Sequence, residues 1–176
     1  RIETEPLPPV ASAGGYVPPS SSPDEYQDDL PAKAKPVSAT TAKAIGTPPA
    51  REGKFIKPVA GRIISGYGLK KDGLHNDGVN IQAAKGDAVR AAETGVVVYT
   101  GSQIEGYGNL ILIRHADQYV TAYAHLDKTL VKKGDKVKRG QTVGTVGSTG
   151  SVDKPQLHFE IRKGTKALDP SGLVTL

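Results

Sequence analysis

The chain has 176 residues, with no cysteine, methionine or tryptophan, and a formal net charge of +5. The missing cysteine excludes disulfide bonds and thiolate metal sites but leaves the cellular compartment open. No apolar run approaches the roughly 20 residues that a membrane-spanning helix needs. Because the chain starts with Arg1 and contains no methionine, we expect it to be a piece of a longer protein, with any signal peptide upstream.

Residues 1–53 differ in composition from the rest of the chain. They hold 10 of the 13 prolines and carry a net charge of −2, against +7 for residues 54–176. A segment this rich in Pro, Ala, Ser and Thr buries too little apolar surface to offset its chain entropy. We therefore predict a largely irregular linker over 1–53 and one domain over 54–176. The acidic run at 24–29 is either part of a simple spacer or a segment that docks on the basic domain.

From residue 54 onward, short β-branched runs alternate with glycines. In chain order, this pattern predicts strands at 63–64, 79–81, 88–91, 96–100, 109–115, 119–126, 142–146 and 157–162. We find no long helical period. Strands this short and closely spaced predict an all-β domain, either an antiparallel β-sandwich or a flattened barrel.

A weak internal repeat supports that fold class. Residues 86–90 and 134–138 both read Gly-Asp-x-Val-basic, which predicts two related β motifs packed on each other. Lipoyl and biotinyl carrier domains contain similar repeats and are an alternative. Such carriers need an exposed, modifiable lysine at a hairpin tip, and the sequence has no recognisable hairpin of that kind.

Four stretches carry the candidate chemistry: 78–81, 107–115, 121–126 and 147–160. In this order they resemble the LytM, or lysostaphin-type, family of cell-wall metallopeptidases, from about residue 54 to the C-terminus. Active members have an opening His-x-Gly-x-Asp, a middle His and a closing His-x-His. The opening His, the Asp and the last His bind zinc, while the other two His residues assist the attacking water.

The resemblance also implies that the zinc site is degenerate. Aligned on Gly78, the sequence places Asn76 at the opening His and Asn80 at the Asp, so His158 is the one ligand that remains. We therefore predict no bound metal, no cofactor and no catalysis. His75 and Asp77 are an alternative pair of zinc ligands, each one position away from the aligned positions or between them. In an extended strand these side chains face away from those of 76 and 80.

At the remaining two family positions, one histidine is replaced and the other is retained. Gln156 stands at the first His of the closing pair, and His125 keeps the middle position. In a strand, Gln156 and His158 share the face opposite Leu157 and Phe159, so we expect both to be exposed in the former active-site groove. His115 matches no metal-binding position and is expected to be structural or merely exposed.

Degenerate members of the family activate other cell-wall hydrolases, and the resemblance implies the same role here. We predict a periplasmic, non-catalytic regulator that binds an amidase or another autolysin during cell division, and that also has peptidoglycan as a candidate ligand. The predicted partner-binding groove consists of Asn76, Asn80, His125, Gln156 and His158. The alternatives are a passive peptidoglycan-binding module and a zinc endopeptidase with rearranged ligands. The basic run at 132–139 lacks interleaved aromatic residues, so we predict no nucleic-acid binding.

Overall fold

The computed structural model describes residues 47–175, so most of the predicted linker, including the acidic run at 24–29, lies outside the described residues. The described part forms short strands and two 3-10 turns. Their bounds are β1 Phe55–Ile56, β2 Arg62–Ser65, β3 Gly68–Leu69, β4 His75–Asn76, β5 Val79–Gln82, β6 Ala88–Arg90, β7 Gly95–Gly101, β8 Asn109–Arg114, η2 Ala116–Gln118, β9 Tyr119–Thr129, β10 Lys136–Val137, β11 Thr142–Val146, β12 Gln156–Lys163, β13 Lys166–Leu168, η3 Pro170–Gly172 and β14 Val174–Thr175.

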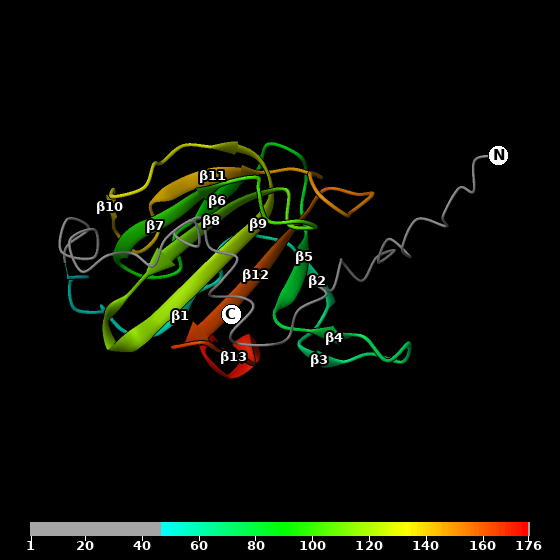
Figure 1. The fold of residues 1–176 in the computed structure, drawn as a ribbon, viewed down its shortest axis with the longest axis horizontal. Coiled ribbons are helices and arrows are strands. Elements are labelled where there is room, and N and C mark those ends of the chain that lie inside the picture. Colours follow the sequence, from blue (N-terminus) through cyan, green and yellow to red (C-terminus); the bar gives the residue numbers. More distant parts are fainter. Residues whose placement is uncertain (1–46, 176) are drawn as a thin grey trace.

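The main sheet has the strand order β10-β7-β8-β9-β12-β5-β2, and its neighbouring strands are antiparallel (Figure 1). Strand β11 pairs with β6 and β9, while β13 pairs with β12. The prediction of an all-β, antiparallel domain is confirmed. One exception is the short parallel pair of β1 with β14. All eight predicted strands are present, whereas six strands of two or three residues were missed because alternation is unreadable over so few positions.

The main sheet is buried on both faces, because apolar residues cover each side. Leu157, Phe159 and Ile161 of β12 point into the larger core cluster, as the two-residue period of a strand requires. A second cluster, which includes Tyr107, Leu110 and Ala124, fills the opposite side. Polar residues on that second face are therefore also enclosed.

The internal repeat corresponds to a repeated turn. The carboxylates of Asp87 and Asp135 each accept a hydrogen bond from the backbone N–H three residues earlier, at 3.1 and 3.0 Å. Gly86 and Gly134 precede them with φ of 95° and 96°, a conformation that side chains disfavour. The same four-residue turn thus leads into β6 and β10.

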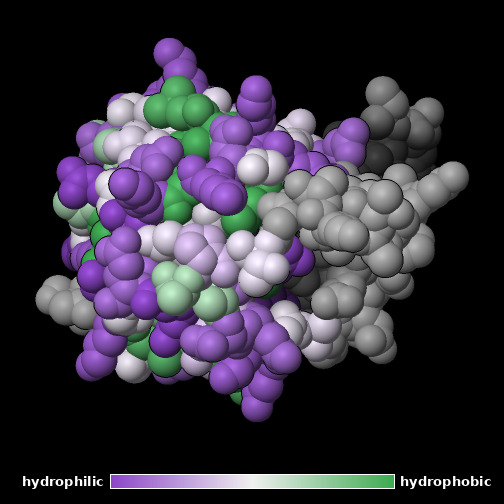
Figure 2. Space-filling model, turned by 90° about the vertical axis from the view of Figure 1, so that its left-hand side faces the viewer, coloured by the Kyte–Doolittle hydropathy of each residue, from purple (hydrophilic) through white to green (hydrophobic). Residues whose placement is uncertain are grey.

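The side of the molecule that carries β10 is largely hydrophilic, with small, separated apolar patches (Figure 2). Exposed lysines of the basic run, such as Lys132 and Lys136, lie in this region. Within residues 47–175, no helix has the length and apolar character needed to cross a membrane. Contacts with the domain begin before residue 54, since the backbone N–H groups of Glu52 and Gly53 donate to the Glu93 carboxylate.

Candidate functional site

The structure brings the five predicted site residues together from four strands. Asn76 ends β4, Asn80 lies in β5, His125 in β9, and Gln156 and His158 in β12. Strands β5, β12 and β9 are adjacent in the main sheet, and His158 pairs directly with Asn80 on one side and Ala124 on the other. The family alignment therefore identified residues that are neighbours in space.

Three of these residues form an amide cluster, defined here as Asn76, Asn80 and Gln156. The backbone N–H of Gly78 donates to Asn76 Oδ1 at 3.1 Å, which assigns the orientation of that amide. Asn76 Nδ2 then donates to Asn80 Oδ1 at 2.9 Å and to Ser65 Oγ at 3.0 Å. Asn80 Nδ2 donates to Gln156 Oε1 at 3.0 Å. The three amides thus satisfy one another's hydrogen-bonding groups.

The expectation that these side chains are exposed is wrong. Asn76, Asn80 and Gln156 are 0% exposed, and His125 and His158 are 1% exposed. The alternation of side chains along a strand correctly predicts that these residues lie outside the larger core. The prediction also assumed that the opposite face of the sheet meets solvent. That face carries the second apolar cluster instead, and the Tyr107 ring packs against His158 with centroids 5.9 Å apart.

Both ring nitrogens of His158 lie close to buried polar side chains. Its Nε2 lies 2.8 Å from Glu160 Oε1, and its Nδ1 lies 3.2 Å from Asn80 Oδ1. The Asn80 oxygen also receives the Asn76 amide. Both nitrogens of the His158 ring are thus directed at neighbouring side chains.

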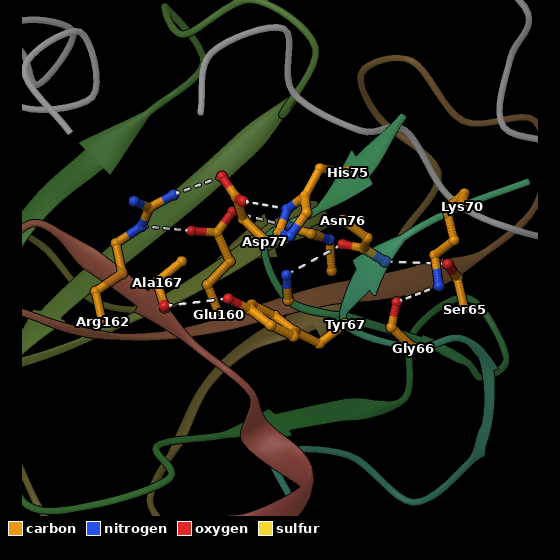
Figure 3. Close-up of polar contacts among 12 residues, drawn as sticks. Ser65, Gly66, Tyr67, Lys70, His75, Asn76, Asp77, Glu160, Arg162 and Ala167 are labelled. Carbon is orange, nitrogen blue, oxygen red and sulfur yellow. Dashed lines mark hydrogen bonds and ion pairs between the residues drawn. The ribbon is translucent and has the colours of Figure 1, made fainter. Parts of the chain in front are cut away.

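Glu160 is the centre of a buried ionic chain (Figure 3). Its Oε2 accepts a hydrogen bond from Arg162 Nε at 2.7 Å, and its Oε1 accepts from the Tyr107 hydroxyl at 3.0 Å. Burial by itself raises the pKa of Glu160, but the charges of Arg162 and His158 and their hydrogen bonds outweigh it and lower the pKa to about 2. Arg162 Nη2 in turn lies 3.3 Å from Asp77 Oδ2. The Arg162 guanidinium thus links the buried carboxylates of Glu160 and Asp77.

His125 occupies the left-handed region with φ of 63°, which is unusual for a residue with a side chain. Its Nδ1 donates to the Thr149 carbonyl at 2.8 Å. Burial, followed by the nearby charge of His158, lowers the pKa of His125 to about 3, so the ring is neutral near pH 7. Among the described residues, its Nε2 has no hydrogen-bond partner.

His115 is structural, one of the two expected roles. It lies outside the site, and its ring nitrogens bond to the Thr94 carbonyl and the Thr121 hydroxyl, each at 2.8 Å. Burial lowers the pKa of His115 to about 4. A neutral, fully hydrogen-bonded ring at this position supports the packing of Phe55, whose ring meets it edge-on.

We expect the domain to lose stability as the pH falls from about 6.5 to 4. The folded-state pKa values of His115 and His125 lie below the usual value near 6.5, so the unfolded chain takes up these protons first. Their stabilising contribution is present above pH 6.5 and is lost as the pH falls, at up to about 3 kcal/mol for His115. Urea unfolding at several pH values measures the slope of the free energy of unfolding against pH. His115→Gln should flatten it, and a free energy of unfolding that stays constant over this range would contradict the assignment.

The alternative ligands His75 and Asp77 form a pair with each other. His75 Nδ1 lies 2.9 Å from Asp77 Oδ1, and neither residue has a recorded contact with His158 in the described part of the chain. Their connection to the site runs through Arg162. The sequence analysis missed Glu160 and Arg162, although both follow His158 at two-residue steps on β12, a strand that is buried almost throughout. Charged residues at these steps were the available signal.

The residues at the zinc position do not fit a zinc ion. A catalytic zinc site needs three ligands with lone pairs directed at one point. Here Asn76 directs an N–H group at Asn80, the Asn80 oxygen accepts that group, and His158 Nδ1 lies 3.2 Å from the same oxygen. Across residues 47–175, no group of three or more His, Cys, Asp or Glu side chains is arranged to hold a metal. We therefore derive no chemical step through zinc.

The fold defines a lysostaphin-type β domain, and its site contains buried amide side chains. The chain belongs to peptidase family M23, which matches residues 74–170. Among solved structures, the catalytic domain of lysostaphin from Staphylococcus simulans is 35% identical with a TM-score of 0.59, and it covers 64% of this chain and 90% of that domain. A zinc-containing peptidase from Vibrio cholerae is 33% identical with a TM-score of 0.62, covering 66% and 39%.

Several curated relatives have names that describe regulation or division. Cell division protein DipM of Caulobacter vibrioides is 51% identical over 63% of this chain and 18% of its own length. Murein hydrolase activator NlpD of Escherichia coli is 45% identical over 64% of this chain and 29% of its own length. The uncharacterized lipoprotein YgeR of Escherichia coli is 42% identical over 77% and 54%. The chain thus spans at most about half the length of these relatives.

Proposed function

We propose that this domain is a non-catalytic activator of peptidoglycan hydrolases, with an amidase as the first candidate partner. The observation that carries the proposal is the amide cluster. Its hydrogen bonds join β4, β5 and β12, and His158 lies beside Asn80, so the side chains at the positions aligned with zinc ligands engage one another. The names of the relatives, a murein hydrolase activator and a cell division protein, support the same role.

The proposed role places the domain in the cell envelope, on the periplasmic side where peptidoglycan and its hydrolases lie. Lipoproteins among the relatives support an envelope location. We propose that the partner binds over the former active-site groove. The five predicted residues then act from below as its buried floor, because their side chains are enclosed and bonded to one another. They fix the shape of the surface that the hydrolase meets.

The experiment is a dye-release assay on labelled sacculi with purified amidases from the same organism. The domain alone should release no dye, and an amidase with the domain should release more than the amidase alone. Binding of the domain to sacculi without an effect on any amidase would favour a passive wall-binding module. Dye release by the domain alone, abolished when a chelator removes its metal, would favour an endopeptidase with rearranged ligands.

A further inference from the structure

Beside the amide cluster lies a polar cavity of about 300 Å³, within the range of ligand-binding pockets. It is lined by residues of two neighbouring hairpins, β3–β4 and β12–β13, and by the segment between β4 and β5. The residues that matter here are Tyr67, His75, Asp77, Arg162, Thr165 and Lys166. None of the five predicted site residues lines it. The cavity is thus a separate feature on the edge of the site.

The floor of this cavity is rigid, and its acidic group is already neutralised. Asp77 is hydrogen-bonded to His75 and ion-paired with Arg162, and its side chain is only 6% exposed. Arg162 also donates to Glu160 and, through Nη1, to the Thr165 carbonyl at 3.2 Å. The Tyr67 hydroxyl bonds to the carbonyl of Ala167, which ties the two hairpins together. These contacts hold the cavity in one shape before a ligand arrives.

The groups that remain available at the rim are a histidine ring nitrogen and a lysine. His75 is about one-third exposed and uses Nδ1 for Asp77, which leaves Nε2 for a ligand. Lys166 is exposed, and no carboxylate of the described residues forms an ion pair with it. A carboxylate entering between these two side chains would meet the His75 ring on one side and the Lys166 ammonium on the other, while the acid in the lining, Asp77, is buried and ion-paired. The cavity therefore favours an acidic ligand group.

One face of the β3–β4 hairpin extends this cavity with an apolar side chain. Leu69 pairs directly with His75, so the two side chains share a face of the hairpin. The Tyr67 ring meets the His75 ring edge-on at 5.2 Å on the same side. Leu69 is 75% exposed, the most exposed large apolar residue in the described part of the chain. An apolar contact beside a carboxylate site matches a protein segment better than a peptidoglycan strand, whose sugars and peptides are mainly polar.

We propose that the polar cavity and Leu69 are the docking site for the activated hydrolase, which inserts an Asp or Glu side chain between His75 and Lys166 and packs an apolar residue on Leu69. This inference rests on the proposed function and specifies where the partner binds. It places the direct side-chain contacts on the open surface at the edge of the former active-site groove, because the polar groups of the enclosed amide cluster beneath it are occupied.

The test uses single variants of exposed residues, which leave the buried ion pairs intact. In the full chain, Leu69→Asp and Lys166→Glu should each weaken binding to the amidase that responds in the dye-release assay by about tenfold or more. The matched controls are Leu130→Asp and Lys136→Glu, at an exposed leucine and an exposed lysine elsewhere. They should change affinity by less than about twofold. Affinity is measured by calorimetry, and thermal unfolding of each variant verifies its fold.

The outcomes separate the two proposals. If wild-type protein activates an amidase and the cavity variants bind it as well as the controls do, the docking site is wrong and the proposed function stands. If no amidase is bound or activated, both fall. Co-sedimentation with sacculi forms a second arm. Cavity variants that lose binding to sacculi but keep amidase affinity would make this a wall-binding site and overturn the proposal.

Discussion

The double variant Asn76→His, Asn80→Asp is expected to bind zinc tightly, whereas the wild-type domain is not. The two new ligands would converge with His158 on the position that the Asn76–Asn80 hydrogen bond now occupies. A complete protein zinc site provides on the order of 10 kcal/mol at neutral pH, so affinity should rise by several orders of magnitude. Zinc ligands must be deprotonated to bind, so binding should release protons.

Calorimetric titration with zinc in two buffers of different ionisation enthalpy measures both the affinity and the proton release. Asn76→Ala, Asn80→Ala is the matched control, since it breaks the same hydrogen bond without adding ligands. Peptidase activity should remain low, because Gln156 still replaces a histidine and zinc ligands need support from surrounding residues. A double variant with no more affinity than the control would show that these positions are not the former ligand set.

Glu160→Gln is expected to destabilise the domain by about 3–5 kcal/mol, the usual cost of leaving buried charges without a partner. Glu160 is fully enclosed between Arg162 and His158, and it accepts three hydrogen bonds. Glutamine keeps the shape but removes the negative charge, and its amide group places an N–H toward one of these donors. The buried Arg162 guanidinium then faces a neutral side chain.

Chemical unfolding at neutral pH gives the difference, with Glu105→Gln as the control because Glu105 is exposed. The control should change the free energy of unfolding by about 0.5 kcal/mol or less. If Glu160→Gln were equally mild, the buried ionic chain would contribute little to the stability of the domain. A second variant, Arg162→Met, tests the same chain from its other side and should also be strongly destabilising.

The sequence predicted the long strands and the grouping of the site, because each rests on a pattern that spans many residues. The alternation of side chains along β12 predicted that Leu157 and Phe159 lie in the core. The order and spacing of the family motifs predicted that Asn80 and His158 lie close together, and they are paired neighbours. The enclosure of the site was not predictable from this alternation. It depends on Tyr107, which lies between β7 and β8, and on its apolar neighbours in β7, β8 and β9. These residues are distant in sequence from Gln156 and His158.

The ionic chain and the polar cavity depend on tertiary contacts in the same way. Asp77 and Arg162 are 85 residues apart in sequence, and no local pattern pairs them. Hairpin β3–β4 consists of two-residue strands, which are too short for alternation to reveal which face Leu69 shares with His75. The features that specify the proposed partner surface thus lie where sequence periodicity carries the least information.

The most direct test of the central claim is amidase activation by domain that has been stripped of metal and dialysed free of chelator before mixing. The account predicts full activation of the amidase, a zinc content far below one ion per chain by mass spectrometry, and no dye release by the domain alone. Activation that disappears on stripping and returns when the domain is reloaded with stoichiometric zinc would contradict it.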